Sequence, residues 1–274
     1  MKTLASLLIV VITLASHASA DSFRIATYNL NWGNRRGDMV LAAINESEPD
    51  LVCFQETTVQ SERFLRQRLA KTYPYFHSIG HKGRFAAERF AFASKTELKG
   101  LVYVPPTAGL FGFYSAELDF GGTTVNVIDV HLTPITIKRG SGITGAMTAL
   151  SETEERHEIE IDAIIDHIDR QRPTIVVGDF NSISTFTAPK RLADIGFVDA
   201  YASVCDDADP HPTWTWPTRP LPLALRIDYI FHSPHFTTIE SGIIRKDGSD
   251  HSLVYAELKR GEPSVATEAA SSRN

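Results

Sequence analysis

Cysteine is scarce in this sequence. The 274 residues include two cysteines, Cys53 and Cys205, too few for a cysteine-rich disulfide framework or for a zinc site built from thiolates. The two could form one disulfide in an oxidising compartment, or Cys53, within the apolar segment DLVCFQE, could be a buried free thiol. The chain is long enough to bury a substantial apolar core without cross-links, so neither alternative decides the fold.

Long apolar runs are also missing beyond the N-terminus. The run LLIVVITL follows Lys2 and precedes Ala18-Ser19-Ala20, a pattern typical of a secretory signal with its cleavage site. We therefore expect export to remove residues 1–20 and to leave a secreted or periplasmic protein. The run is too short to span a bilayer comfortably, and no later run is longer. We expect no stable membrane insertion and a soluble monomer.

The sequence also has no excess of basic over acidic residues. Removing residues 1–20 takes one lysine from the 27 basic residues and leaves the 33 acidic ones, which moves the formal net charge from −6 to −7. A protein that held nucleic acid mainly by neutralising phosphates would be basic, at least locally. Two basic segments are candidate readers of phosphate, with solvated loops as the equal alternative. They are TPITIKRGSGITG, with Lys138 and Arg139, and HKGRFAAER, with Lys82, Arg84 and Arg89.

Helical patterns occur at four places in the chain. Residues 38–48 predict a helix that ends before a proline, and SERFLRQRLAK predicts a second. Ser151 and Glu154 form a capping-box pattern in front of a third helix, which is expected to end near Asp169. A short fourth helix is expected around residues 189–195.

Strand patterns separate and follow these helices. Apolar and polar residues alternate in FRIATYNL and TTVNVIDVHL, and short apolar runs occur in DLVCFQE, RFAFAS, TIVVGDF and LRIDYIF. No repeat of fixed period is present. Residues 21–259 therefore predict one layered α/β or α+β domain with mixed sheets. Residues 260–274 lack apolar periodicity and predict a disordered tail.

Several predicted strands end in a polar or titratable side chain. Taken singly, each such residue has an ordinary explanation as a turn residue, a solvated strand end, a cap or a satisfied core histidine. Taken together, strand ends that share one rim of a sheet would form a site. Crowded carboxylates raise one another's pKa values unless a cation is present, and an oxygen-rich set suits Mg²⁺ or Mn²⁺. The candidates are Asn29, Glu56, His131, Asp179, Asn181, Asp228, Asp250 and His251.

Six segments, in order across nearly the whole mature chain, carry a resemblance to a known family. They are TYNLNWGN, CFQE, DVHL, GDFN, IDYIF and SDHS. In this order they resemble the endonuclease/exonuclease/phosphatase superfamily, which includes pancreatic deoxyribonuclease, abasic-site endonucleases and neutral sphingomyelinases. The resemblance implies an α/β fold in four layers, a two-sheet mixed β-sandwich flanked by helices, with a divalent-metal phosphoesterase site at one end.

The resemblance also implies roles for the metal and for the attacking water. Glu56 would hold the metal, with Asn29 beside it and Asp250 contributing. Asp179 would orient or deprotonate the water, and Asn181 would bond the phosphate. Both residues come from the GDFN turn, which explains why this buried run stops at a glycine and then presents an acid and an amide.

The two histidines receive the remaining implied roles. His251, oriented by Asp228, would bind or protonate a phosphoryl oxygen, and His131 would assist the leaving group. A carboxylate beside an imidazole makes physical sense because it fixes the tautomer and favours the charged form.

The expected activity is that of a secreted Mg²⁺- or Mn²⁺-dependent phosphodiester hydrolase, with nucleic acid as the favoured substrate of an endonuclease or exonuclease. The same chemistry would serve a phospholipid or sphingomyelin phosphodiesterase, and a catalytically silent binding module is a third alternative. A lipid enzyme would be expected to carry an exposed apolar insertion. The only aromatic loop, HPTWTWP, holds Trp214 and Trp216 between prolines, which favours a soluble substrate.

Overall fold

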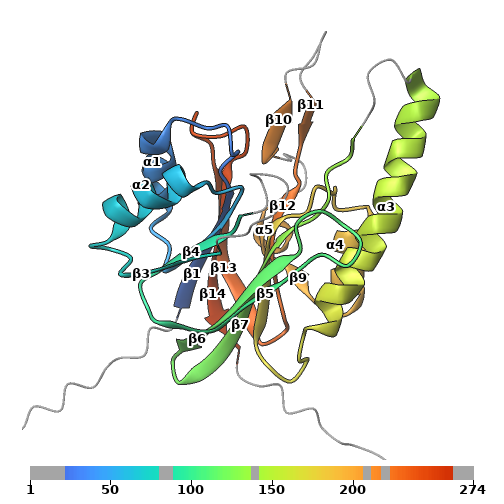
Figure 1. The fold of residues 1–274 in the computed structure, drawn as a ribbon. Coiled ribbons are helices and arrows are strands. Elements are labelled where there is room, and N and C mark those ends of the chain that lie inside the picture. The colour runs from blue at the N-terminus through green and yellow to red at the C-terminus, as the bar shows by residue number, and fades with distance from the viewer. Residues whose placement is uncertain (1–21, 80–88, 137–141, 206–210, 217–222, 262–274) are drawn as a thin grey trace, which may run out of the picture.

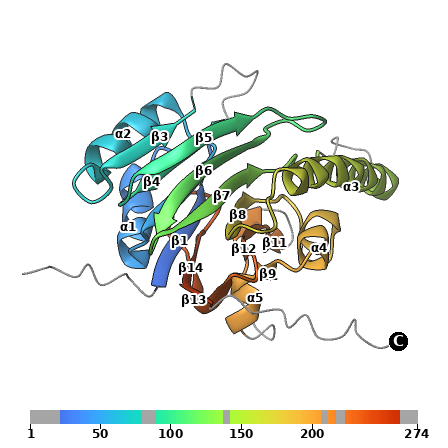
Figure 2. The ribbon, with the colours of Figure 1, turned by 90° about the horizontal axis from the view of Figure 1, so that it is seen from below.

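Two mixed β-sheets pack face to face, with helices covering both outer faces (Figures 1 and 2). The computed structural model describes residues 22–79, 89–136, 142–205, 211–216 and 223–261. Within these residues each sheet has six strands. This four-layer arrangement confirms the fold that the sequence predicted.

The first sheet has the strand order β13-β14-β1-β2-β4-β3 and the second has the order β5-β6-β7-β8-β12-β9. The strands of the first sheet are β1 (Ser22–Asn29), β2 (Leu51–Gln55), β3 (Tyr75–Ser78), β4 (Ala91–Ser94), β13 (Phe236–Ile244) and β14 (Leu253–Arg260). Those of the second are β5 (Leu98–Val104), β6 (Phe113–Phe120), β7 (Thr123–His131), β8 (Thr174–Asp179), β9 (Val198–Asp199) and β12 (Asp228–His232). A separate two-stranded sheet pairs β10 (Trp214–Trp216) with β11 (Leu223–Leu225).

The helices divide between the two outer faces. Helices α1 (Gly37–Ser47) and α2 (Val59–Leu69) cover the first sheet, and α3 (Gly142–Asp166) and α4 (Thr187–Asp194) cover the second (Figure 2). The short α5 (Ala200–Val204) contacts β12 and β13. None of the described helices is both long enough and apolar enough to cross a membrane.

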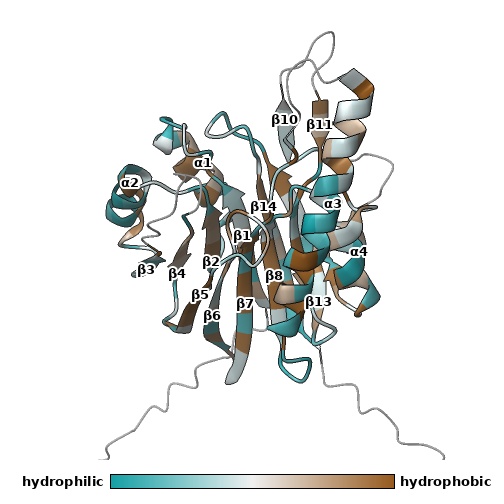
Figure 3. Ribbon diagram, turned by 45° about the vertical axis from the view of Figure 1, so that its right-hand side comes forward, coloured by the Kyte–Doolittle hydropathy of each residue, from teal (hydrophilic) through white to brown (hydrophobic). Residues whose placement is uncertain are grey.

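Three apolar clusters lie between these four layers. Alternation along β1 sends Phe23 and Ile25 into the cluster between the sheets, and Ala26 and Tyr28 into the cluster under α1 and α2. The third cluster packs α3, through residues such as Ile161, against the second sheet. Figure 3 shows the strands as largely apolar and α2 and α3 as more polar. Cys53 and Cys205 are both free, and Cys53 is buried in the central cluster.

The strand directions bring the predicted polar ends to one rim. Strand β1 runs parallel to β2, and β7 runs parallel to β8, so that Asn29 is paired with Gln55 and His131 with Asp179. Strand β12 is antiparallel to β8, which puts its first residue, Asp228, opposite Asp179. The expectation that these ends share a rim is therefore confirmed.

The predicted start of the third helix was wrong. Helix α3 begins at Gly142, so Ser151 and Glu154 lie inside it and form no capping box. The first turns of α3 leave Ile143 86% exposed and Met147 62% exposed. These first turns bury no apolar stripe. The spacing of apolar residues in the sequence therefore predicted only the half of the helix that packs against the sheet. Residues 1–20 and most of the predicted tail lie outside the described residues.

Candidate active site

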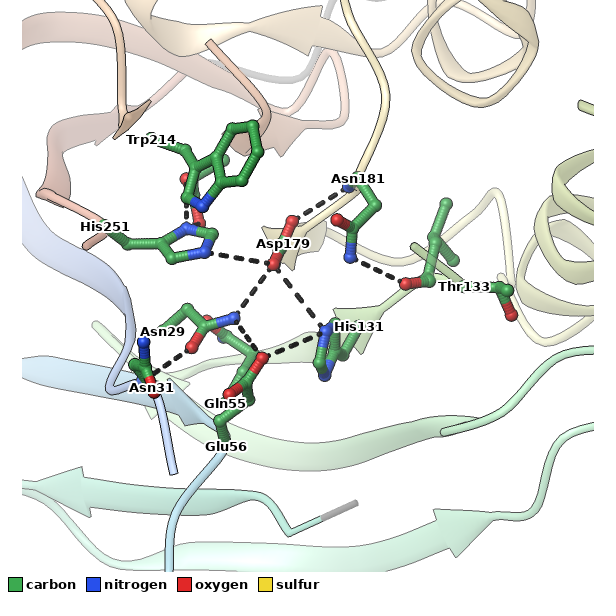
Figure 4. Close-up of polar contacts among 12 residues, drawn as sticks. Asn29, Asn31, Gln55, Glu56, His131, Thr133, Asp179, Asn181, Trp214 and His251 are labelled. Carbon is green, nitrogen blue, oxygen red and sulfur yellow. Dashed lines mark hydrogen bonds and ion pairs between the residues drawn. The ribbon is translucent and has the colours of Figure 1, made fainter. Parts of the chain in front are cut away.

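One buried amide connects the two sheets at the rim. The Asn29 side chain lies at the end of β1, and its Nδ2 donates hydrogen bonds to Glu56 Oε1 (3.1 Å) and to Asp179 Oδ2 (2.9 Å), as Figure 4 shows. Glu56 follows β2 with a left-handed backbone (φ 54°), a conformation that costs roughly 1–3 kcal/mol for a residue other than glycine. Its second oxygen, Oε2, accepts the backbone N–H of Trp32 (3.1 Å). The carboxylates of Glu56 and Asp179 therefore converge on one amide.

His131 lies against the same two carboxylates. Its Nε2 is 3.7 Å from Glu56 Oε1 and 3.6 Å from Asp179 Oδ2. The ring stacks on Phe111, with centroids 3.9 Å apart and planes at 11°. Because the imidazole is buried and held flat by this stacking, its Nε2 has a fixed direction into the site.

A histidine between two acids forms the other wall. His251 Nδ1 lies 3.0 Å and 3.1 Å from the two oxygens of Asp228, and Nε2 lies 3.7 Å from Asp179 Oδ2. Burial lowers the pKa of His251, but the charges of Asp228 and Asp179 outweigh it and raise that pKa to about 10. His251 is therefore an imidazolium at neutral pH, oriented by Asp228.

Asp179 has the properties of a proton acceptor. Burial raises its pKa to about 7, with the charge of Asp228 adding to the effect and that of His251 opposing it. A carboxyl with a pKa near neutrality is suited to general acid–base catalysis. Asp179 Oδ1 also accepts the backbone N–H of Asn181 (2.8 Å), and Asn181 Nδ2 donates to the carbonyl of Leu132 (2.9 Å). The GDFN turn thus ties β8 to the end of β7.

Asp250 lies at the edge of this constellation. Its Oδ1 accepts from Asn31 Nδ2 (2.8 Å) and its Oδ2 from Trp214 Nε1 (3.1 Å). Asn31 is joined in turn to Asn29, whose Oδ1 accepts the Asn31 backbone N–H (2.9 Å). The structure therefore brings seven of the eight predicted residues into direct contact with one another and connects Asp250 through Asn31.

Comparison with known proteins identifies the family. A model of the Endonuclease/Exonuclease/phosphatase family matches residues 26–251, a range that contains all eight of these residues. The chain belongs to this family. Its members are phosphoesterase hydrolases, so the chain belongs among hydrolases of the phosphodiesterase and nuclease type. A search of curated proteins gives no match.

Solved structures of the endonuclease/exonuclease/phosphatase fold are similar to this chain. A family protein from Beutenbergia cavernae is 20% identical with a TM-score of 0.68, covering 88% of this chain and 72% of its own. One from Bacteroides thetaiotaomicron is 17% identical with a TM-score of 0.67, and the match covers 88% of this chain and 98% of that protein. TDP2 from D. rerio, complexed with single strand DNA product, is 19% identical with a TM-score of 0.60. This match covers 87% of this chain and 99% of that protein. At these identities the likeness shows the fold.

The donor atoms in this family member fit a hard divalent cation. The buried carboxyl of Asp179 and the half-buried carboxyl of Glu56 share one amide, and burial raises the pKa of both. A cation at Glu56 would relieve this crowding, with oxygen ligands of the kind that Mg²⁺ prefers. A second group, formed by Asp179, Asp228 and His251, has ligand atoms within 4.8 Å of one another. We interpret it as a hydrogen-bonded Asp228–His251 pair facing Asp179, because Asp228 already holds the Nδ1 side of His251.

A layer of polar side chains beneath the rim was not predicted. Gln55 Nε2 donates to Asp129 Oδ1 (2.5 Å) and to Thr27 Oγ1 (2.9 Å), which connects the two sheets just below Asn29 and Glu56. Burial raises the pKa of Asp129 well above its ordinary value. The sequence signal was the period of two, since Thr27 precedes Asn29 by two residues and Asp129 precedes His131 by two.

Helix α3 supports the loop after β7 from outside. His157 Nε2 lies 2.7 Å from the carbonyl oxygen of Thr133, and Glu160 accepts both the backbone N–H (3.2 Å) and the hydroxyl (2.8 Å) of Thr133. Both side chains are buried. They hold in place the end of β7, where the Leu132 carbonyl accepts the hydrogen bond from the Asn181 side chain. No local motif marked these two residues, because they look like any polar positions on a helix.

The predicted substrate readers have mixed outcomes. Lys138, Arg139, Lys82 and Arg84 lie outside the described residues. Arg89 is 16% exposed and donates to both oxygens of Glu62, with Nη2 at 2.6 Å, so it is a structural partner of α2 and not a reader. In the aromatic loop, half-buried Trp214 points inward to Asp250.

Proposed function

We propose that this chain is an exported, divalent-metal-dependent phosphodiester hydrolase that cleaves nucleic acid. The observation that carries the proposal is the placement of Asp179, whose carboxylate has the imidazolium of His251 3.7 Å away on one side and His131 3.6 Å away on the other. A proton acceptor flanked by two proton donors or charge stabilisers is what an in-line displacement at phosphorus requires. A catalytically silent module would have no reason to retain this costly burial of charge.

The side chains have distinct tasks in this proposal. Asp179 accepts the proton of the attacking water as the new phosphorus–oxygen bond forms. His251 donates a hydrogen bond to a phosphoryl oxygen, and His131 supplies a proton to the oxygen that leaves as the scissile bond breaks. Asn181 binds the phosphate through its side chain. A divalent cation held by Glu56, with Asn29 and Asp250 nearby, would neutralise phosphate oxygens and stabilise the charge of the transition state.

Nucleic acid is the substrate that the described surface favours. Trp214 donates a hydrogen bond to Asp250, so its indole is engaged at the rim and is not part of an apolar insertion of the kind that an enzyme acting on lipid aggregates would use. A fold neighbour, TDP2 from D. rerio, was solved with single strand DNA product. The acidic net charge of the chain implies that phosphate is bound locally, beside the metal, and not by a broad basic face.

Export is the part of the proposal that depends on the sequence alone. The Lys2 and LLIVVITL pattern followed by Ala18-Ser19-Ala20 supports removal of residues 1–20, which leaves residues 21–274, with the catalytic domain at 21–259. Intact-mass measurement of the protein recovered outside the cytoplasm should give an N-terminus at Asp21. Retention of Met1 would contradict export.

A matched substrate panel tests the activity. Purified mature protein with Mg²⁺ or Mn²⁺ would receive single- and double-stranded DNA, RNA, sphingomyelin, phosphatidyl lipids and sugar or inositol phosphomonoesters, with Asp179→Asn as the inactive control. We expect hydrolysis of polynucleotide that EDTA abolishes. Hydrolysis of lipid head groups without nuclease activity would establish the lipid alternative, and no hydrolysis of any substrate would support the silent module.

A further inference from the structure

A cavity of about 420 Å³ opens beside Glu56, and its lining does not include Asp179 or His251. It lies between the loop that follows β1 and the first turn of α2, where α1 and α2 lie side by side (Figure 1). Its lining includes two aromatic side chains, Trp32 and Phe64, and the polar residues Arg35, Gln60 and Ser61. The volume is within the range of about 300–1,000 Å³ that is usual for small-molecule sites.

The loop that forms one wall is held rigidly. Asn31 has a left-handed backbone (φ 53°), and its Oδ1 accepts the backbone N–H of Gly33 (3.0 Å). The Asn34 backbone N–H bonds back to the Asn31 carbonyl (2.7 Å), and Asn34 Oδ1 accepts from the Arg36 backbone (2.6 Å). Asn34 Nδ2 donates to the carbonyl of Gly248. A loop with this many internal bonds presents its side chains in a fixed arrangement.

Two exposed side chains of this loop, Trp32 and Arg35, line the cavity. Trp32 is 57% exposed, and its backbone N–H is bonded to the carboxylate of Glu56, so an exposed indole stands on a backbone anchored to the proposed metal ligand. Within the described residues Arg35 makes no ion pair, whereas the neighbouring Arg36 pairs with Asp247 (3.5 Å). An exposed aromatic residue beside a free cation is a combination that binds bases and phosphates.

We propose that this cavity is a subsite for a nucleobase adjacent to the scissile phosphate, with the base stacked on Trp32 and Arg35 directed to the neighbouring phosphate. This inference rests on the proposed function. The aromatic walls suit a planar ring, and the Gln60 side chain offers an amide donor and an amide acceptor to its hydrogen-bonding edge.

Product binding tests the subsite without requiring turnover. Adenosine 5′-monophosphate, phosphocholine and inorganic phosphate would each be titrated calorimetrically into the Mg²⁺-loaded protein and into Trp32→Ala, Trp32→Phe and Tyr75→Ala. We expect Trp32→Ala to weaken the nucleotide at least about fivefold, the lower end of what one stacked base contributes. Trp32→Phe should restore most of the affinity, and inorganic phosphate should be unaffected by any of the three.

Tyr75→Ala is the matched control. Tyr75 is an exposed aromatic residue that pairs with Ser94, which in turn pairs with Leu51 at the start of β2, so it lies at the opposite rim. Equal nucleotide affinity in Trp32→Ala and Tyr75→Ala would overturn the subsite even if the protein is a nuclease. Nucleotide binding that depends on Trp32, in a protein without nuclease activity, would uphold the subsite and overturn the proposed function. Preferential binding of phosphocholine would overturn both.

Discussion

Two polar layers lie on the same strands, one above the other, and they differ in how many titratable groups they bring together. The inner layer consists of Thr27, Gln55 and Asp129, and the rim layer of Asn29, Glu56, His131 and Asp179. In the inner layer the Gln55 amide donates to one carboxyl and one hydroxyl, and Gln55 Oε1 and Asp129 Oδ2 are buried without a hydrogen-bond partner among the described residues. In the rim layer two carboxylates share the Asn29 amide, and the imidazole of His131 lies against both carboxylates. Burial of polar groups therefore does not by itself mark a site; an excess of charge that only a ligand can balance does.

The largest expected difference between the layers is in catalysis. Asp179→Asn removes the proton acceptor and should lower kcat on polynucleotide at least ~10³-fold, because general base catalysis contributes about 10²–10⁴-fold. Its free energy of unfolding should not fall, since a crowded buried carboxylate is lost. Thr27→Val, the inner-layer control, should keep kcat within about threefold and lower the free energy of unfolding by roughly 1 kcal/mol. Steady-state kinetics measures kcat, and urea unfolding measures the free energy of unfolding. Equal losses of kcat in Asp179→Asn and Thr27→Val would contradict the distinction between the rim layer and the inner layer.

Metal dependence should separate Glu56 from other acidic residues. Glu56→Gln keeps the shape of the side chain but removes the charge that would hold Mg²⁺, so the Mg²⁺ concentration for half-maximal activity should rise at least about tenfold. Excess Mg²⁺ should recover part of the activity. Glu158→Gln, an exposed change on α3, should leave the titration unchanged. A Glu56→Gln protein with the wild-type Mg²⁺ profile would remove Glu56 from the metal site.

The inner layer should be visible in the pH dependence of stability. Burial raises the pKa of Asp129 well above its ordinary value, so the folded chain keeps this proton at pH values where the unfolded chain has lost it. The contribution of Asp129 is complete below about pH 4 and declines as pH rises toward the folded pKa, by up to about 1.4 kcal/mol per pH unit. Asp129→Asn has no such proton and should flatten the decline in unfolding free energy.

Urea unfolding between pH 4 and pH 8 measures this effect. Asp179, Glu56 and Glu160 also have raised pKa values and contribute in the same direction, but they remain in both proteins, so the difference isolates Asp129. Asp166→Asn, at an exposed position on α3, should follow the wild-type profile. A slope for Asp129→Asn as steep as that of the wild type would show that Asp129 is ionised in the fold.

The sequence predicted the strands that are buried on both faces and missed those at the edges. Strands β1, β2, β7, β8 and β12 were all located, because their apolar residues repeat with a period of two or run continuously. Strands β3, β5 and β13 carry mixed exposed and buried residues and gave no clear pattern. An edge strand is hydrogen-bonded to a neighbouring strand on one side only. Which strand that neighbour is depends on the fold and cannot be seen in the local sequence.

The sequence predicted which residues meet at the rim, but it did not predict the contacts that hold them in place. Asn29, Glu56, His131 and Asp179 each end a strand, and parallel strands bring such ends together. The contacts that support them come from distant segments: Phe111 stacks on His131, and Glu160 holds the loop beyond it. Left-handed backbones at Glu56 and Asn181 aim the side chains, and only the folded rim can impose them on residues other than glycine.

The antiparallel pairing of β1 with β14 has a practical consequence. Ser22 is paired with Lys259 at one end of these strands, while Asn29 at the other end of β1 enters the site. A short linker could join the two neighbouring ends, and a circular permutant opened at a surface loop should retain the same sheet. An affinity handle attached beside Ser22 would stand roughly 25 Å from the reacting phosphate, at about 3.3 Å per strand residue. The protein can therefore be tethered to a surface for single-molecule work while long substrates still reach the opposite rim.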